Sequence, residues 1–166
     1  MVYMKKLGGS PGGGGDSMPL VALVPLRVLT GLVFLHAGWQ KLHVGFIGQH
    51  HLSRQLEGAL VDGTPYLWYA RLLREWALPH ATLVSYVVVY GELALGAALV
   101  VGLFARPMAV FGLLGMVSAT LERGLQLSAS STFAYAAIFF TLAMAASGRV
   151  MGLDARLRGR LPAWLV

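Results

Sequence analysis

The stretch ATLVSYVVVYGELALGAALVVGLF, residues 81–104, contains Glu92 as its only charged residue. A helix needs about 20 apolar residues to cross the hydrocarbon core of a bilayer. This stretch is therefore long enough to span a membrane. Three further stretches have the same character, and these are residues 19–38, 107–124 and 130–147. The sequence predicts an all-α fold, a four-helix transmembrane bundle.

The composition of the whole chain agrees with a membrane location. Hydrophobic residues make up 57% of the 166 residues and charged residues 12%, whereas a soluble domain carries about 25% charged residues. This excludes an ordinary soluble enzyme, a disordered chain and a coiled coil. The net charge of +6 does not indicate a nucleic-acid partner, because the basic residues form no continuous patch outside the apolar segments. We expect membrane lipid to be a partner instead.

The two ends of the chain differ from its apolar middle. Residues 1–17 include a Gly-rich run that cannot pack, so we expect a disordered cytoplasmic tail. Residues 151–166 contain three arginines and a tryptophan, which is typical of a basic segment at a membrane interface. Residues 18–150 remain as the transmembrane domain.

The distribution of Lys and Arg predicts the orientation of the bundle. Four spans place both termini on one side, and that side holds seven basic residues against five on the other. Short loops rich in Lys and Arg face the cytoplasm. We therefore expect a multi-pass protein of the plasma membrane with both termini in the cytoplasm.

The long loop of residues 41–80 also contains a helical pattern. Between Pro65 and Leu78, a stripe of Arg71, Arg74 and Glu75 runs beside several aromatic residues. This pattern is typical of an amphipathic helix that lies in the membrane interface with its aromatic side chains at headgroup depth.

Small residues recur at helical spacing in two of the predicted spans. They are Ala94, Ala98 and Gly102 in one span, and Gly115 and Ala119 in the next. Small side chains let helix backbones approach closely where lipid supplies no hydrophobic drive. We expect these stripes to form helix contacts.

Arg27 and Glu92 are the isolated charges within two predicted spans. A charge at membrane depth costs about 2.5–3.5 kcal/mol on insertion scales, so each is expected to have a partner or a function. At 1.5 Å per residue, they lie about 12 and about 18 Å from the cytoplasmic side. An arginine side chain covers that difference, which predicts an ion pair. The pair either stabilises the bundle or forms part of a pocket for a polar ligand or a proton.

A polar and aromatic cluster stands at the outer end of the first span, and its members are His36, Trp39, Gln40, Lys41 and His43. Two histidines could protonate a quinone or ligate a haem. The alternative is interfacial anchoring, with Lys41 paired to Glu122. The candidate pocket residues are thus Arg27, His36, Lys41 and Glu92.

Metal and haem are not expected. The loop histidines have few carboxylates near them, whereas zinc needs three or four converging ligands. The chain contains no cysteine, which excludes a covalently attached haem and thiol-exchange chemistry.

Three motifs in order resemble the DoxX family of small four-helix membrane proteins, of which DoxD is a close relative. They are PLRVLTGLVFLHAGWQKL at residues 25–42, YGELALGA at 90–97 followed by GLFAR at 102–106, and SGRVMGLD at 147–154. Within these motifs the resemblance assigns structural positions to Gly31, Gly38, Gly91, Arg106, Arg149 and Asp154.

The resemblance implies a membrane component of a redox system. DoxD-type relatives belong to a thiosulfate:quinone oxidoreductase, and other members are similar to membrane partners of soluble redox proteins. It implies quinone as a cofactor and a soluble or membrane redox protein as a partner. The alternative is a non-enzymatic membrane scaffold or small transporter that docks a partner protein, with or without formation of a homo-oligomer. Whether the chain is itself an enzyme stays open at this point.

Overall fold

The computed structural model describes residues 22–47, 50–62, 66–123 and 131–145. Within these residues the secondary structure is entirely helical, which confirms the all-α prediction there. The elements are α2 (Leu23–His43), α3 (His51–Asp62), α4 (Leu67–Leu72), the π-helical turn η1 (Leu73–Ala77), α5 (Ala81–Val101), α6 (Ala105–Arg123) and α7 (Ser131–Ala145).

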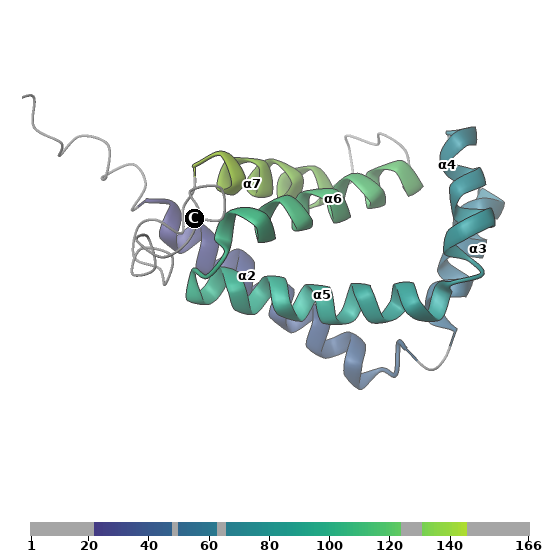
Figure 1. Ribbon diagram of the computed structural model, residues 1–166, viewed down its shortest axis with the longest axis horizontal. Coiled ribbons are helices and arrows are strands. Elements are labelled where there is room, and N and C mark those ends of the chain that lie inside the picture. Colours follow the sequence, from purple (N-terminus) through teal and green to yellow (C-terminus); the bar gives the residue numbers. More distant parts are fainter. Residues whose placement is uncertain (1–21, 48–49, 63–65, 124–130, 146–166) are drawn as a thin grey trace, which may run out of the picture.

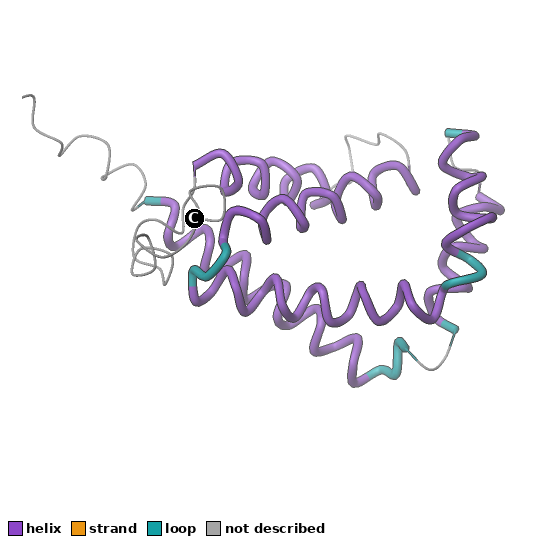
Figure 2. The backbone as a smooth tube through the Cα atoms, viewed as in Figure 1, coloured by secondary structure: helices purple, strands orange, loops and turns teal. Residues whose placement is uncertain are grey.

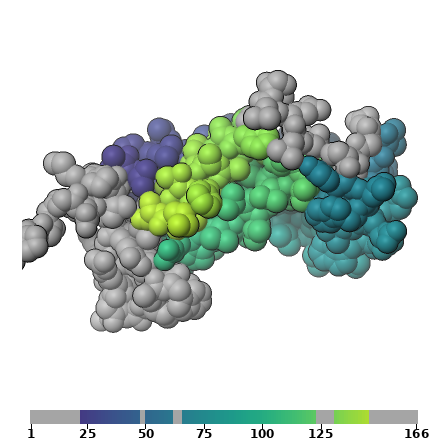
Figure 3. Space-filling view, turned by 90° about the horizontal axis from the view of Figure 1, so that it is seen from above, coloured from purple at the N-terminus to yellow at the C-terminus, as the bar shows by residue number. Residues whose placement is uncertain are grey.

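Four long helices run lengthwise through the molecule as two pairs (Figure 1). Helix α2 lies against α5, and α6 lies against α7, while α5 and α6 connect the two pairs. The short helices α3 and α4 stand across one end (Figure 2). Seen from above, α7 covers the body of the molecule beside α6, with α3 and α4 at its end (Figure 3).

Glycine allows α2 and α5 to touch along their backbones. A Cβ added at Gly31 would lie 2.8 Å from the Gly96 carbonyl oxygen, and one added at Gly38 would lie 2.9 Å from Leu93 Cγ. Both positions were assigned by resemblance, and here they are close helix contacts. The stripe predicted on α5 is different from the observed one, because Ala94 is exposed and Gly96 makes the contact.

The second pair of helices, α6 and α7, packs through the motif residue Arg106 and through Gly112, which lies outside the motifs. Arg106 Nε donates a hydrogen bond of 3.0 Å to the Ala143 carbonyl oxygen of α7. Gly112 leaves room for the Phe139 ring, which lies 2.6 Å from the position of an added Cβ. Phe139 is fully buried and packs edge-on against Phe34 of α2. The core thus sits where α2, α5, α6 and α7 meet.

The turn between α5 and α6 consists of Gly102, Leu103 and Phe104, and not of Ala105–Arg106 as the span limits predicted. Gly102 ends α5 in the left-handed conformation, with φ at 72°. Its amide N–H and that of Leu103 both bond to the Ala98 carbonyl oxygen, which is the usual way to satisfy the end of a helix.

The loop helix predicted near residues 65–78 is present as α4 followed by η1. Arg71, Arg74 and Glu75 are exposed, as the stripe predicts. On the opposite side, a second core cluster joins this helix to α3 and to the start of α5. The cluster comprises Leu52, Leu56, Tyr69, Leu73, Ala77 and Ala81. The position of the helix in a membrane interface stays a prediction.

Only one helix in the described part of the chain, α5, is long and apolar enough to cross a membrane by length and composition. Helix α7 is apolar but has 15 described residues. Helix α2 continues to His43, five residues beyond the predicted limit, and so includes Lys41. The predicted count of four spans is therefore not confirmed.

The outward faces of the long helices are apolar. Only 28% of the most apolar 18 residues of α5 are buried inside the structure. Helix α5 is therefore not the enclosed central helix of a soluble bundle. The neighbouring helices also expose large hydrophobic side chains, among them Leu29, Leu32, Leu114, Phe140 and Met144. Exposed apolar surface of this extent is typical of contact with lipid or with another protein.

Some predictions lie outside the described residues. They concern the tails at residues 1–17 and 151–166 and the motif residues Arg149 and Asp154.

Candidate functional site

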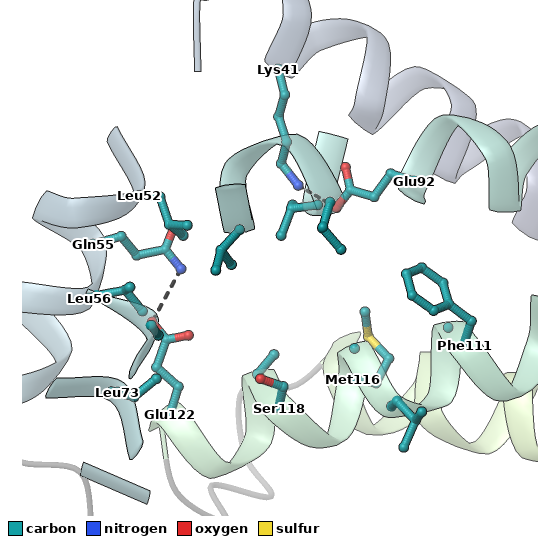
Figure 4. Close-up of a pocket in the computed structure, with 18 of the residues that line it drawn as sticks. Lys41, Leu52, Gln55, Leu56, Leu73, Glu92, Phe111, Met116, Ser118 and Glu122 are labelled. Atoms are coloured by element: carbon teal, nitrogen blue, oxygen red, sulfur yellow. Dashed lines mark hydrogen bonds and ion pairs between the residues drawn. The ribbon is translucent and has the colours of Figure 1, made fainter. Parts of the chain in front are cut away.

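A cavity of about 480 Å³ lies between α5 and α6, and α3, α4 and η1 close one end of it (Figure 4). Pockets for small molecules typically measure about 300–1,000 Å³, with apolar walls and a few polar groups. Most of the lining side chains here are apolar. Phe111 and Met116 project into the cavity from α6.

An ion pair lies in the wall formed by α2 and α5. The ammonium group of Lys41, on the last turn of α2, pairs with Oε1 of Glu92, in the middle of α5. The side chains are 30% and 20% exposed, so the pair is largely shielded from solvent. The second carboxylate oxygen, Glu92 Oε2, is buried and accepts no hydrogen bond from any residue in the described ranges. A ligand in the cavity would find both a cation and a carboxylate there.

The predicted ion pair between Arg27 and Glu92 does not form. Glu92 bonds to Lys41 through one oxygen, and its other oxygen has no partner in the described part of the chain. The physical reason is the register of α2 against α5. Gly31 packs at the level of Gly96 and Val100, so Arg27 lies beyond that level, about 12 Å or more from Glu92 along the helix axis.

Arg27 and His36 do not line the cavity. Arg27 is 1% exposed and buried elsewhere in the bundle. His36 is exposed on the surface of α2. His43, seven residues later, is exposed as well, and its ring centroid lies 4.7 Å from that of Trp39. The cavity thus brings together Lys41 and Glu92 of the four predicted pocket residues.

A second polar contact closes the cavity at the end formed by α3. Gln55 Nε2 donates a hydrogen bond of 3.2 Å to Glu122 Oε1, and both residues line the cavity. One alternative predicted a pair between Lys41 and Glu122. This pair does not form, because Lys41 pairs with Glu92 and Glu122 accepts its hydrogen bond from Gln55. The sequence alone does not identify Gln55 as a cavity residue. The only indication in it is the place of Gln55 between the apolar positions Leu52 and Leu56.

Tyr69 joins the same end of the cavity to α6. Its hydroxyl group donates to the Ser118 carbonyl oxygen at 3.1 Å and lies 2.7 Å from Ser118 Oγ. Burial raises the pKa of the Tyr69 phenol above its usual 10, and the Glu122 charge acts in the same direction, while the hydrogen bond with Ser118 opposes them. Tyr69 is therefore a neutral donor at physiological pH. The sequence does not predict the contact between Tyr69 and Ser118, because the two residues are 49 positions apart.

The sequence model of the DoxX family matches residues 22–123, which is more than half of the 166 residues. The matched region runs from α2 to α6 and includes every residue that lines the cavity. No curated protein and no solved structure matches the chain. The match confirms the resemblance that the motifs indicated. The protein is therefore a membrane protein that belongs to the DoxX family.

Proposed function

We propose that this protein is the membrane subunit of a quinone-linked redox system and that it binds a quinone in the cavity between α5 and α6. The observation that carries the proposal is an apolar cavity of about 480 Å³ whose wall contains the Lys41–Glu92 pair. A quinone has a flat apolar ring with carbonyl oxygens at its edge. Its chemistry matches apolar walls with a few polar groups.

The ion pair suits both oxidation states of such a ligand. The Lys41 ammonium group can donate a hydrogen bond to a quinone carbonyl oxygen. Glu92 Oε2, which is buried and bonds to no residue of the described segments, can accept one from a hydroxyl group of the reduced form. When bound, the quinone supplies two-electron redox chemistry. The two side chains position its oxygen and hold a proton beside it, while a partner redox protein supplies the electrons.

The same proposal places α2, α5, α6 and α7 across the plasma membrane, with both termini in the cytoplasm. The exposed apolar side chains on the outward faces of these helices support this placement. Helices α3 and α4 would then lie at one membrane surface. From there they would cover the end of the cavity that Gln55 and Glu122 close.

Equilibrium binding of a radiolabelled quinone to the purified protein in lipid nanodiscs tests the proposal. We expect saturable binding to the parent protein. Glu92→Gln and Lys41→Met should each weaken it about tenfold or more, since hydrogen bonds to charged groups contribute about 1.5–3 kcal/mol. The matched control is Glu75→Gln, which makes the same chemical change in the exposed Arg71–Glu75 pair away from the cavity.

Two results would remove this function. One is the absence of saturable binding by a folded parent protein, which would leave the scaffold or transporter alternative. The other is binding by Glu92→Gln that equals that of Glu75→Gln, because the ion pair would then play no part in the site.

A further inference from the structure

A glycine on the cavity wall makes no close packing contact with any described residue. Gly115 lies within α6 and lines the cavity. A Cβ added there would meet no atom of the described segments within 4 Å. Its backbone is ordinary helix and not the left-handed conformation that favours glycine. Gly112, one turn earlier, has the opposite character, because Phe139 occupies the space beside it.

Glycine is among the poorest helix-forming residues, and only proline is worse. An alanine at position 115 would favour the helix and would clash with nothing in the structure. Neither the backbone nor the packing of the described residues therefore accounts for a glycine here. What the missing side chain does provide is space on the cavity side of α6.

The cavity reaches the outer surface of the bundle beside this glycine. Five apolar residues both line the cavity and are about half exposed. Leu72 at 48% and Trp76 at 54% stand on α4 and η1, whereas Val87 at 50%, Phe111 at 43% and Leu114 at 62% stand on α5 and α6. These last three form a mouth, and Val87 belongs to α5, the helix that can cross a membrane. This mouth between α5 and α6 is therefore apolar and opens on a face that would meet hydrocarbon.

The polar groups of the cavity lie elsewhere on its wall. Lys41 and Glu92 point toward one another from α2 and α5, and Gln55 and Glu122 meet at the end near α3 (Figure 4). A ligand with a polar ring and an apolar chain matches this division, with the ring near the ion pair and the chain in the mouth.

We propose that the mouth formed by Val87, Phe111, Leu114 and Gly115 is a subsite for the hydrocarbon chain of a ligand dissolved in the membrane, and that Gly115 sets its width. The ligand class is a single oxygenated ring that carries one alkyl or isoprenoid chain and enters sideways from the lipid. The identity of the ring rests on the proposed function, whereas the chain subsite rests on the mouth itself.

Two quinone probes separate the ring from the chain. One is a methylated 1,4-benzoquinone without a side chain, and the other is the same ring with a decyl chain. Binding is measured in phosphatidylcholine nanodiscs, with each concentration corrected for partition into empty nanodiscs. Gly115→Leu should weaken binding of the decyl probe at least tenfold and change binding of the chainless probe less than threefold.

Gly58 provides the matched control. It also lies within a helix, α3, with no atom within 4 Å of an added Cβ, but it lines no part of the cavity. Gly58→Leu should leave the binding of both probes unchanged. Gly115→Ala and Gly58→Ala should both raise the melting temperature, while only Gly115→Ala weakens binding of the decyl probe. A packing role for Gly115 would instead lower the melting temperature.

The outcomes distinguish the two proposals. If the parent protein binds both probes but Gly115→Leu leaves binding of the decyl probe unchanged, the chain subsite is refuted and the quinone site stands. Equal weakening of both probes also refutes it, since the substitution would then act on the ring. If neither probe binds to the parent protein, both proposals fail.

Discussion

Replacing Gly96 with alanine should separate helices that touch through their backbones. The added Cβ would lie 2.5 Å from the Leu35 amide nitrogen and 2.7 Å from the Gly31 carbonyl oxygen. The first of these contacts is about 1 Å shorter than the optimum for heavy atoms. Both neighbours are backbone atoms, which cannot rotate away. Helices α2 and α5 must therefore move apart, or one of them must bend.

The expected change in stability follows from two opposing terms. Overpacking costs about 1–3 kcal/mol, and we take about 3 because the neighbours cannot yield. Alanine contributes about 1 kcal/mol through its better helix propensity. Gly96→Ala should thus destabilise the fold by about 2 kcal/mol. Gly115→Ala meets no neighbour in the described part of the chain and should stabilise the fold by about 1 kcal/mol, which makes a difference of about 3 kcal/mol between the variants.

Thermal unfolding followed by circular dichroism, with all variants in the same detergent, measures this difference. For a chain of this size each kcal/mol corresponds to about 2–4 °C, so the melting temperatures should differ by about 6–12 °C, with Gly96→Ala the lower. A Gly96→Ala variant as stable as the parent protein would refute the close contact between α2 and α5.

Two further predictions concern contacts near the ends of helices. The pKa of Tyr69 is raised above 10 in the folded state, so its contribution to stability is complete below pH 10 and is lost as the pH rises through the folded value. The melting temperature should therefore fall above pH 10 less steeply in Tyr69→Phe than in the parent protein, and parallel curves would contradict this. Arg106→Gln removes the bond to the Ala143 carbonyl oxygen and should destabilise the fold by about 1.5 kcal/mol, measured by the same thermal unfolding. A change below a few tenths of a kcal/mol would show that the bond contributes nothing.

Apolar periodicity predicted the helices well, because both the long apolar runs and the amphipathic loop segment bury one face. Arg71, Arg74 and Glu75 illustrate this, since their stripe is exposed while the opposite face of the same helix belongs to the second core cluster. The charge of Glu92 also indicated a partner within the bundle, and the structure gives it one. Burial patterns of this kind depend on residues that are close in the sequence, so they can be predicted from one amino-acid sequence.

The identity of that partner could not be read in the same way. Counting the depth of a residue from the end of its own helix assumes that all helices begin at the same height in the membrane. The actual register of α2 against α5 is set by the contact between Gly31 and Gly96. That register brings Lys41, not Arg27, to the level of Glu92. The contacts of Gln55 with Glu122 and of Tyr69 with Ser118 have the same origin, because each joins segments whose relative position depends on the whole fold.

The glycine contacts between α2 and α5 decide which parts of the molecule can move. Backbone atoms that already touch at Gly31 and Gly96 leave these two helices no freedom to slide or to close further. Arg106 binds α6 to α7 in turn. The turn from Gly102 to Phe104 joins the two stiff pairs at one end, and the bonds of Tyr69 to Ser118 and of Gln55 to Glu122 hold α6 to the loop helices at the other. Any widening of the space between α5 and α6 at that second end therefore has to break these two contacts first.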